Sequence, residues 1–109
     1  MKWLYIKYFI LPKFSKEAYI LEIGDGSISK QLEKLGYENY YIVGDRQTIR
    51  KNIKSPFIYT IDHEFDNESF DLIIYSIKRP TQYRPFTIYT HHALKKDGYI
   101  LKGYKLCQK

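Results

Sequence analysis

Short apolar runs alternate along this chain with segments whose apolar residues recur at helical spacing. The apolar runs predict strands at residues 18–23, 40–43, 57–60, 70–75 and 99–101. The segments between them predict helices over residues 27–35, 46–54 and 85–95. Strands that alternate with helices are typical of a parallel sheet with right-handed crossovers. The alternation therefore predicts an α/β fold, while residues 1–14 fit a helix or a strand equally well.

The size and composition of the chain predict a single domain over residues 1–109. A chain of this length can bury one core, and its hydrophobic content of 44% supports that core. Cys107 is the one cysteine, so no disulfide can form within the chain, which favours a reducing compartment. The apolar run from Trp3 to Leu11 is too short to span a bilayer and lacks the cleavage site of a signal peptide. We therefore expect a cytoplasmic protein with no membrane partner.

The net charge of +6 is concentrated in the last third of the sequence. Residues 77–109 carry eight basic residues and one acid, Asp97, whereas residues 1–76 are close to neutral. A one-sided basic field attracts polyanions, so nucleic acid is one expected partner. A charged surface that only maintains solubility is the alternative explanation.

A glycine-containing turn follows the first buried run. Its sequence is Glu22-Ile23-Gly24-Asp25-Gly26-Ser27, placed between a predicted strand and a predicted helix. Gly24 permits a tight turn, and Gly26 would let a ligand lie against bare backbone. Asp45 closes the next strand, 21 positions beyond Gly24. A carboxylate at about this offset accepts hydrogen bonds from ribose hydroxyls in nucleotide-binding α/β folds.

Four stretches in order resemble the class I S-adenosylmethionine-dependent methyltransferase family. They are YILEIGDGS, YYIVGD, IDHEFDNESFDLIIYS and ALKKDGYILKGY, and they cover residues 18–104. The resemblance implies a Rossmann-like three-layer sandwich with a mainly parallel sheet of about five strands in the order 3-2-1-4-5. It also implies that S-adenosylmethionine binds across the carboxyl ends of the first two strands.

The same resemblance implies a role for each matched residue. Glu22 and the backbone of Gly24, Asp25, Gly26 and Ser27 would face the methionine part of the cofactor. Asp45 would hold the ribose, and Asp62 with His63 would border the adenine. The implied activity is methyl transfer to a nucleic acid or a protein partner. No residue stands out as a general base, so we name no catalytic residue, and no metal site is expected.

The chain departs from the family pattern at three places. Ile28 stands where many members have a third glycine. The stretch after the fourth strand, Ser76 to Pro80, lacks the Asn/Asp-Pro-Pro-aromatic signature, which disfavours methylation of a base amine. The family's sixth and seventh strands are missing, so we expect the exposed edge of the fifth strand to be covered by the N-terminal segment, a second copy or a partner subunit.

A basic and aromatic group follows the fourth strand, where substrate enters in this fold. Tyr75, Lys78, Arg79 and Arg84 would form a rim that contacts phosphates and stacks on bases, and an ordinary charged loop is the alternative explanation. Two alternatives to a methyltransferase remain. One is a non-catalytic scaffold or nucleic-acid-binding module of the same fold. The other is an NAD-type dinucleotide binder, which is disfavoured because Ser29 stands at the third glycine of the G-x-G-x-x-G pattern.

Overall fold

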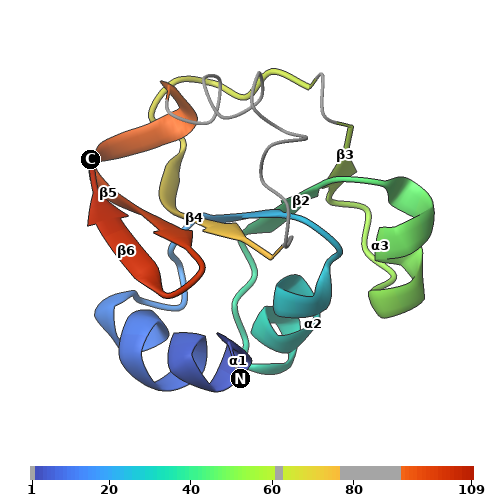
Figure 1. The fold of residues 1–109 in the computed structure, drawn as a ribbon. Coiled ribbons are helices and arrows are strands. Elements are labelled where there is room, and N and C mark those ends of the chain that lie inside the picture. Colours follow the sequence, from blue (N-terminus) through green and yellow to red (C-terminus); the bar gives the residue numbers. More distant parts are fainter. Residues whose placement is uncertain (1, 61–62, 77–91) are drawn as a thin grey trace.

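The computed structural model describes residues 2–60, 63–76 and 92–109, which form a sheet with helices packed on it (Figure 1). The strands are β1 (Ile20–Ile23), β2 (Tyr40–Val43), β3 (Ile58–Tyr59), β4 (Phe70–Tyr75), β5 (Leu94–Lys102) and β6 (Lys105–Gln108). Their order is β3-β2-β1-β4-β5-β6. The pairings from β3 to β5 are parallel, and β6 is antiparallel to β5. The predicted α/β class and the order 3-2-1-4-5 are therefore confirmed.

The central strands are buried on both faces of the sheet. All residues of β1 are buried, and β4 is buried except for the half-exposed Asp71. Branched aliphatic side chains fit a pleated surface covered on both sides, which explains why these strands are apolar in the sequence except for Glu22 and Asp71.

The helical elements are α1 (Lys2–Tyr5), a π-helix (Ile6–Ile10), a 3-10 turn (Leu11–Lys13), α2 (Ser27–Lys34) and α3 (Arg46–Asn52). The ambiguous N-terminal stretch is thus helical. Its Ile6 and Ile10 share one core cluster with Leu32 of α2 and Ile49 of α3, so these elements cover the same face of the sheet. No helix in the described ranges is long and apolar enough to cross a membrane.

A second core cluster lies on the opposite face of the sheet. It contains Leu21, Phe70 and Ile73 together with Ala93 and Leu94. The predicted helix over 85–95 lies outside the described residues up to residue 91, and its predicted end at Lys95 is wrong. Leu94 already pairs with Phe70 as the first residue of β5. Ala93 and Leu94 are both buried, as the helical stripe required, but only Ala93 is helical and Leu94 is buried as part of β5.

The turn predicted at Asp97-Gly98 is an irregularity inside β5. The pairing shifts between Phe70, opposite Leu94, and Leu72, opposite Tyr99. Asp97 has a φ of 68°, the left-handed conformation that Asp tolerates better than most residues. A strand can therefore continue through a dipeptide that usually ends one.

The expectation of an exposed edge on the fifth strand is wrong, because β6 covers it. Lys102 pairs with Lys105 across the two-residue turn Gly103-Tyr104, and the φ of 61° at Gly103 permits this tight reversal. The N-terminal segment packs on a face of the sheet, where Leu106 of β6 joins its cluster. Strand β6 is therefore the outer strand on this side of the described sheet (Figure 1).

Candidate cofactor site

The parallel pairing brings the two predicted halves of the cofactor site to one edge of the sheet. Ile23, the last residue of β1, pairs with Val43 of β2 and with Tyr75 of β4. The amide of Gly24 donates to the carbonyl of Val43 at 2.9 Å, and the amide of Ser76 donates to the carbonyl of Ile23 at 3.0 Å. The segments that follow all three strands therefore begin side by side.

The loops after β1 and β2 touch through their backbones. A Cβ placed on Gly44 would lie 2.2 Å from the carbonyl oxygen of Gly24, closer than any side chain can approach. Glycine at position 44 is thus required by the neighbouring loop. The bend at Gly24–Gly26 and the carboxylate of Asp45 are held at the same edge by this contact.

Gly26 is needed for its conformation and for the packing of α3. Its φ of 86° is left-handed, and it forms the N-cap of α2. A Cβ here would lie 3.1 Å from Cγ2 of Ile49 and 3.2 Å from Cγ2 of Ile53. The bare side of Gly26 therefore faces α3, a reason for glycine that the sequence analysis missed. A ligand contact with its backbone stays a prediction.

Glu22 is fully buried, and its carboxylate holds the bend and the start of α2. Oε2 accepts from the amide of Gly26 at 3.0 Å, and Oε1 accepts from the amide of Ser29 at 2.7 Å. The hydroxyl of Ser76 also donates to Oε2, at 2.5 Å. Burial raises the pKa of Glu22, while the hydrogen bonds from Ser76 and Ser29 act in the opposite direction. Glu22 thus acts on the site as a positioning residue.

Asp25 and Ser27 complete the hydrogen bonding of the bend. The Asp25 side chain accepts from the Ser27 amide at 3.0 Å, and the Asp25 amide donates to the Ser76 hydroxyl at 3.2 Å. Asn52, in the last turn of α3, donates to the Asp25 carbonyl at 2.8 Å. The carboxylates of Glu22 and Asp25 therefore accept hydrogen bonds from backbone amides at the start of α2.

Asp45 is exposed and caps the N-terminus of α3. Its Oδ2 accepts from the amide of Thr48 at 3.0 Å and from the Thr48 hydroxyl at 2.7 Å. These bonds lower the pKa of Asp45, so the side chain stays ionised at neutral pH. Oδ1 accepts no hydrogen bond from the described residues and is free to bind a hydroxyl group.

The other predicted site residues are placed only in part. Asp62, Lys78, Arg79 and Arg84 lie outside the described residues. His63 is exposed, with its ring centroid 4.5 Å from that of Tyr59 and 4.6 Å from that of Phe65.

Tyr75 ends β4 at the expected edge, but its side chain is 2% exposed and belongs to the second core cluster. In this arrangement its ring is not presented for base stacking. Its place on a substrate rim stays a prediction.

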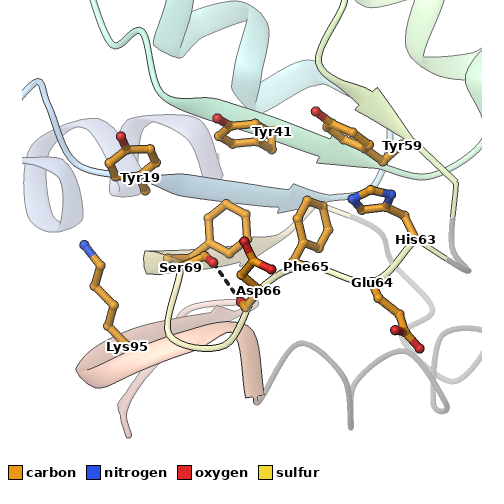
Figure 2. Close-up of a pocket in the computed structure, with 10 residues that line it drawn as sticks. Tyr19, Tyr41, Tyr59, His63, Glu64, Phe65, Asp66, Ser69 and Lys95 are labelled. Atoms are coloured by element: carbon orange, nitrogen blue, oxygen red, sulfur yellow. Dashed lines mark hydrogen bonds between the residues drawn. The ribbon is translucent and has the colours of Figure 1, made fainter.

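The sequence analysis missed a cavity of about 410 Å³ on the second face of the sheet. Figure 2 shows Tyr19, Tyr41 and Tyr59, which come from or precede three adjacent strands, aligned along one wall of this cavity. Phe65 lies below them, and His63 stands at the end nearest β3. The available signal was that each of the three apolar runs carries a tyrosine that lines the cavity, namely Tyr19, Tyr41 and Tyr59. The bend at Gly24–Gly26 and Asp45 do not line this cavity.

The described residues contain no group of three or more histidine, cysteine, aspartate or glutamate side chains that could hold a metal ion.

No family model and no curated protein matches this sequence. Solved structures do match. One is the MccD protein, with a TM-score of 0.59 and 13% identity over 89% of this chain and 49% of that chain. Another is phosphoethanolamine N-methyltransferase 1 from Haemonchus contortus in complex with phosphoethanolamine and S-adenosylhomocysteine, with a TM-score of 0.57 and 16% identity over 84% of this chain and 23% of that chain.

A third match is an S-adenosylmethionine-dependent methyltransferase from Thermotoga maritima, described as a possible histamine N-methyltransferase. Its TM-score is 0.54, with 19% identity over 91% of this chain and 47% of that chain. The present chain thus spans about half or less of the length of each of these proteins. The strand order and these matches together show that it has the fold of the S-adenosylmethionine-dependent methyltransferases.

Proposed function

We propose that this protein binds S-adenosylmethionine at the edge formed by the ends of β1 and β2. The observation that carries the proposal is the backbone contact between Gly24 and Gly44, which fixes the glycine bend beside Asp45. Asp45 would accept hydrogen bonds from the ribose hydroxyls through Oδ1, while Oδ2 remains bound to Thr48. We also propose that Asp62 and His63 border the adenine.

The charges at the start of α2 favour this cofactor over a dinucleotide. In dinucleotide-binding folds a helix N-terminus at this place binds pyrophosphate through free amides. Here the amides of Gly26, Ser27 and Ser29 already donate to the carboxylates of Glu22 and Asp25. A pyrophosphate would meet negative charge and few free donors. S-adenosylmethionine carries a sulfonium and an ammonium against one carboxylate, so Asp25 beside the bend opposes it less than it opposes a pyrophosphate.

The bound cofactor would supply a methyl group activated by the neighbouring sulfonium. The contribution of the chain is to orient that group, because methyl transfer by in-line displacement depends on alignment more than on proton transfer. Glu22 and Ser76 would serve this end by fixing the bend between β1 and α2. Two of the matched structures are named as methyltransferases, which supports the same activity.

Calorimetric titration with S-adenosylmethionine and S-adenosylhomocysteine tests cofactor binding. We expect saturable heat with both compounds and none with NAD. Asp45→Asn should weaken binding about tenfold or more, because it removes a charge-assisted hydrogen bond while asparagine still caps α3. Glu38→Gln removes an exposed acid that precedes β2, at the end of the strand opposite to Asp45, and is the matched control. If the folded protein gave no heat with either S-adenosylmethionine or S-adenosylhomocysteine, the proposal would be wrong.

Nucleic acid is the methyl acceptor that we propose, with a protein partner as the alternative. The support is the concentration of basic residues in 77–109, where eight bases accompany one acid. Transfer of a labelled methyl group from the cofactor to RNA, DNA or protein fractions distinguishes these acceptors. Binding to oligonucleotides should weaken as salt increases, and should weaken further when Lys78, Arg79 and Arg84 are all neutralised.

A non-catalytic module of the same fold is the second candidate function. It is favoured by the eight basic residues in 77–109, which could bind a polyanion without any methyl transfer. This function predicts oligonucleotide binding that is unchanged by the cofactor, with no methyl transfer to any fraction.

A further inference from the structure

The outward face of the N-terminal helical segment, residues 2–13, is apolar and exposed. Leu4, Tyr8 and Phe9 have relative exposures of 49%, 62% and 67%. On the inward face, Ile6 and Ile10 are buried in the first core cluster. The segment therefore has two apolar faces, of which the sheet covers only one, and the candidate cofactor site uses neither.

The turn between β5 and β6 extends this exposed face. Tyr104 is 60% exposed, and its carbonyl accepts from the Tyr5 hydroxyl at 3.0 Å. The ring of Tyr5 also lies against those of Tyr104 and Phe9, at centroid distances of 5.2 and 5.7 Å. We call Leu4, Tyr8, Phe9 and Tyr104 the aromatic patch. Of the exposed large hydrophobic side chains in the described ranges, only Tyr19 and Phe57 lie outside it.

The segments that carry the aromatic patch are basic. Residues 2–16 include four lysines and no acid, and residues 98–109 include three lysines and no acid. The ammonium group of Lys7 lies 5.4 Å from the ring centroid of Tyr8, directly beside the patch. An aromatic surface bordered by lysines suits a partner that is both apolar and negatively charged.

A hollow of about 320 Å³ adjoins the same segment. Its walls include the apolar side chains of Leu11, Phe14 and Leu35, and Lys7 and Lys16 also line it. None of its described lining residues is acidic. Such a hollow could take an anionic headgroup at the lysines with apolar atoms against its walls.

We propose that this face docks on an anionic phospholipid surface. Leu4, Tyr8, Phe9 and Tyr104 enter the boundary between headgroups and acyl chains, and Lys7 and Lys16 contact lipid phosphates. A second copy of the chain would bring like charges together, and the exposed Leu4 and the apolar walls of the hollow suit acyl chains better than a sugar–phosphate backbone. The apolar run that is too short to span a bilayer is long enough to lie on one.

Vesicle binding of the full chain tests the proposal. The protein should co-sediment with vesicles containing phosphatidylserine and far less with vesicles of phosphatidylcholine alone. The one tryptophan, Trp3, precedes Leu4 of the patch and is partly buried against the first core cluster, and its fluorescence emission should shift to shorter wavelength with phosphatidylserine vesicles only.

Two sets of variants locate the contact. The triple substitution Leu4→Ser, Tyr8→Ser, Phe9→Ser should lower the vesicle affinity about tenfold or more. Lys7→Gln and Lys16→Gln should each lower it about fivefold. The double variant Tyr19→Ser, Phe57→Ser, at the exposed hydrophobic residues outside the patch, is the matched control and should bind as wild type does. Circular dichroism confirms that each variant is folded.

Three outcomes would overturn the proposal. In the first, the wild-type and triple-variant proteins sediment equally with phosphatidylserine vesicles. In the second, the wild-type protein does not sediment with these vesicles at all. In the third, the triple substitution abolishes a concentration-dependent dimer or oligonucleotide binding and leaves vesicle binding unchanged. The second and third outcomes would show that the aromatic patch does not bind lipid. Because none of these measurements involves S-adenosylmethionine, their failure is independent of the proposed function.

Discussion

Glu22 joins the bend after β1, the first turn of α2 and the residue that follows β4. Its two carboxylate oxygens accept from the amides of Gly26 and Ser29, and the hydroxyl of Ser76 donates to one of them. An acid in a glycine turn suggests a ligand contact from the sequence alone. Here all of these hydrogen bonds are internal, so the side chain shapes the site from beneath it.

The substitution Glu22→Gln should lower stability in a pH-dependent way. An amide accepts only through its carbonyl oxygen, so one of the two backbone amides loses its partner, at a cost of about 1–3 kcal/mol. Burial raises the pKa of Glu22 in the folded protein above its ordinary value of 4.5. The folded state therefore holds the proton more tightly than the unfolded chain, and this stabilising contribution is lost as pH rises from the unfolded to the folded pKa.

Urea unfolding of both proteins over a pH series measures this effect. The difference in free energy of unfolding, wild type minus Glu22→Gln, should be largest at acidic pH and should fall as the pH increases. Groups common to both proteins cancel in that difference. A difference that grows with pH would show that the folded protein favours the ionised form of Glu22.

Asp45 makes a second residue-scale prediction, because its side chain has two separate tasks. Oδ2 caps α3 through Thr48, whereas Oδ1 is free for a ligand. Asp45→Ala should lower both the thermal unfolding midpoint and the cofactor affinity. Asp45→Asn should lower the affinity alone, since asparagine caps helices about as well as aspartate. Thermal unfolding followed by circular dichroism separates the two effects, and equal midpoints for the two variants would contradict the assignment.

At the scale of elements, the loops after β1 and β2 are fitted to each other. The Gly24 carbonyl occupies the space that a side chain at position 44 would need. The contact is between backbones, so neither loop can relax by rotating a side chain. Any substitution at position 44 must move the strand ends themselves.

Gly44→Ala should therefore reduce stability by about 1–3 kcal/mol and also weaken cofactor binding. Gly36→Asn provides the control. Gly36 has a φ of 90°, which asparagine tolerates, and a Cβ there meets no atom within 4 Å. Urea unfolding with calorimetric titration gives both quantities. If Gly44→Ala bound the cofactor as well as Gly36→Asn does, the loop contact would have no part in the site.

The elements that sequence patterns located correctly are those with one strong local signal. The run Phe70–Tyr75 is apolar except for Asp71, and the observed β4 has the same bounds. Leu94 was misplaced because burial beside Ala93 fits a helix or a strand, and its pairing with Phe70 decides the matter. Strand β6 was missed because Lys105–Gln108 is mostly polar and is held by pairing with β5.

The site was predictable to the same limited extent. Parallel topology places Gly24 and Asp45 at one edge, and the sequence supplied that topology through its alternation of strands and helices. The hydrogen bonds of Glu22 and the packing of Gly26 on Ile49 depend on tertiary contacts that no local pattern contains. The tyrosine-lined cavity likewise needs three strands in register before its wall exists.

At the scale of the whole molecule, the two faces of the sheet are covered differently. One face is closed by the N-terminal segment, α2 and α3, whose apolar side chains form the first core cluster. The other carries the second cluster and the aromatic cavity (Figure 2). The N-terminal segment is therefore part of the core, even though its outer face is exposed.

Substitutions on the two sides of that segment should change the free energy of unfolding by very different amounts. Ile6→Ala should destabilise the protein by about 2–5 kcal/mol, because Ile6 is fully buried in the first cluster. Phe9→Ala, at a side chain that is 67% exposed, should change stability little. Urea unfolding measures both. Similar losses for the two variants would mean that the segment is not anchored by its inward face.

The contact between Tyr5 and Tyr104 has a consequence for how the chain is made. The two residues are 99 positions apart, yet their side chain and backbone are hydrogen-bonded. A ribosome synthesises Tyr5 first and must finish β5 and its turn before the partner of Tyr5 exists. The Tyr5 contact can therefore form only after β5 and its turn exist, whereas Leu32 and Ile49, which pack with the inward face of the same segment, are available much earlier.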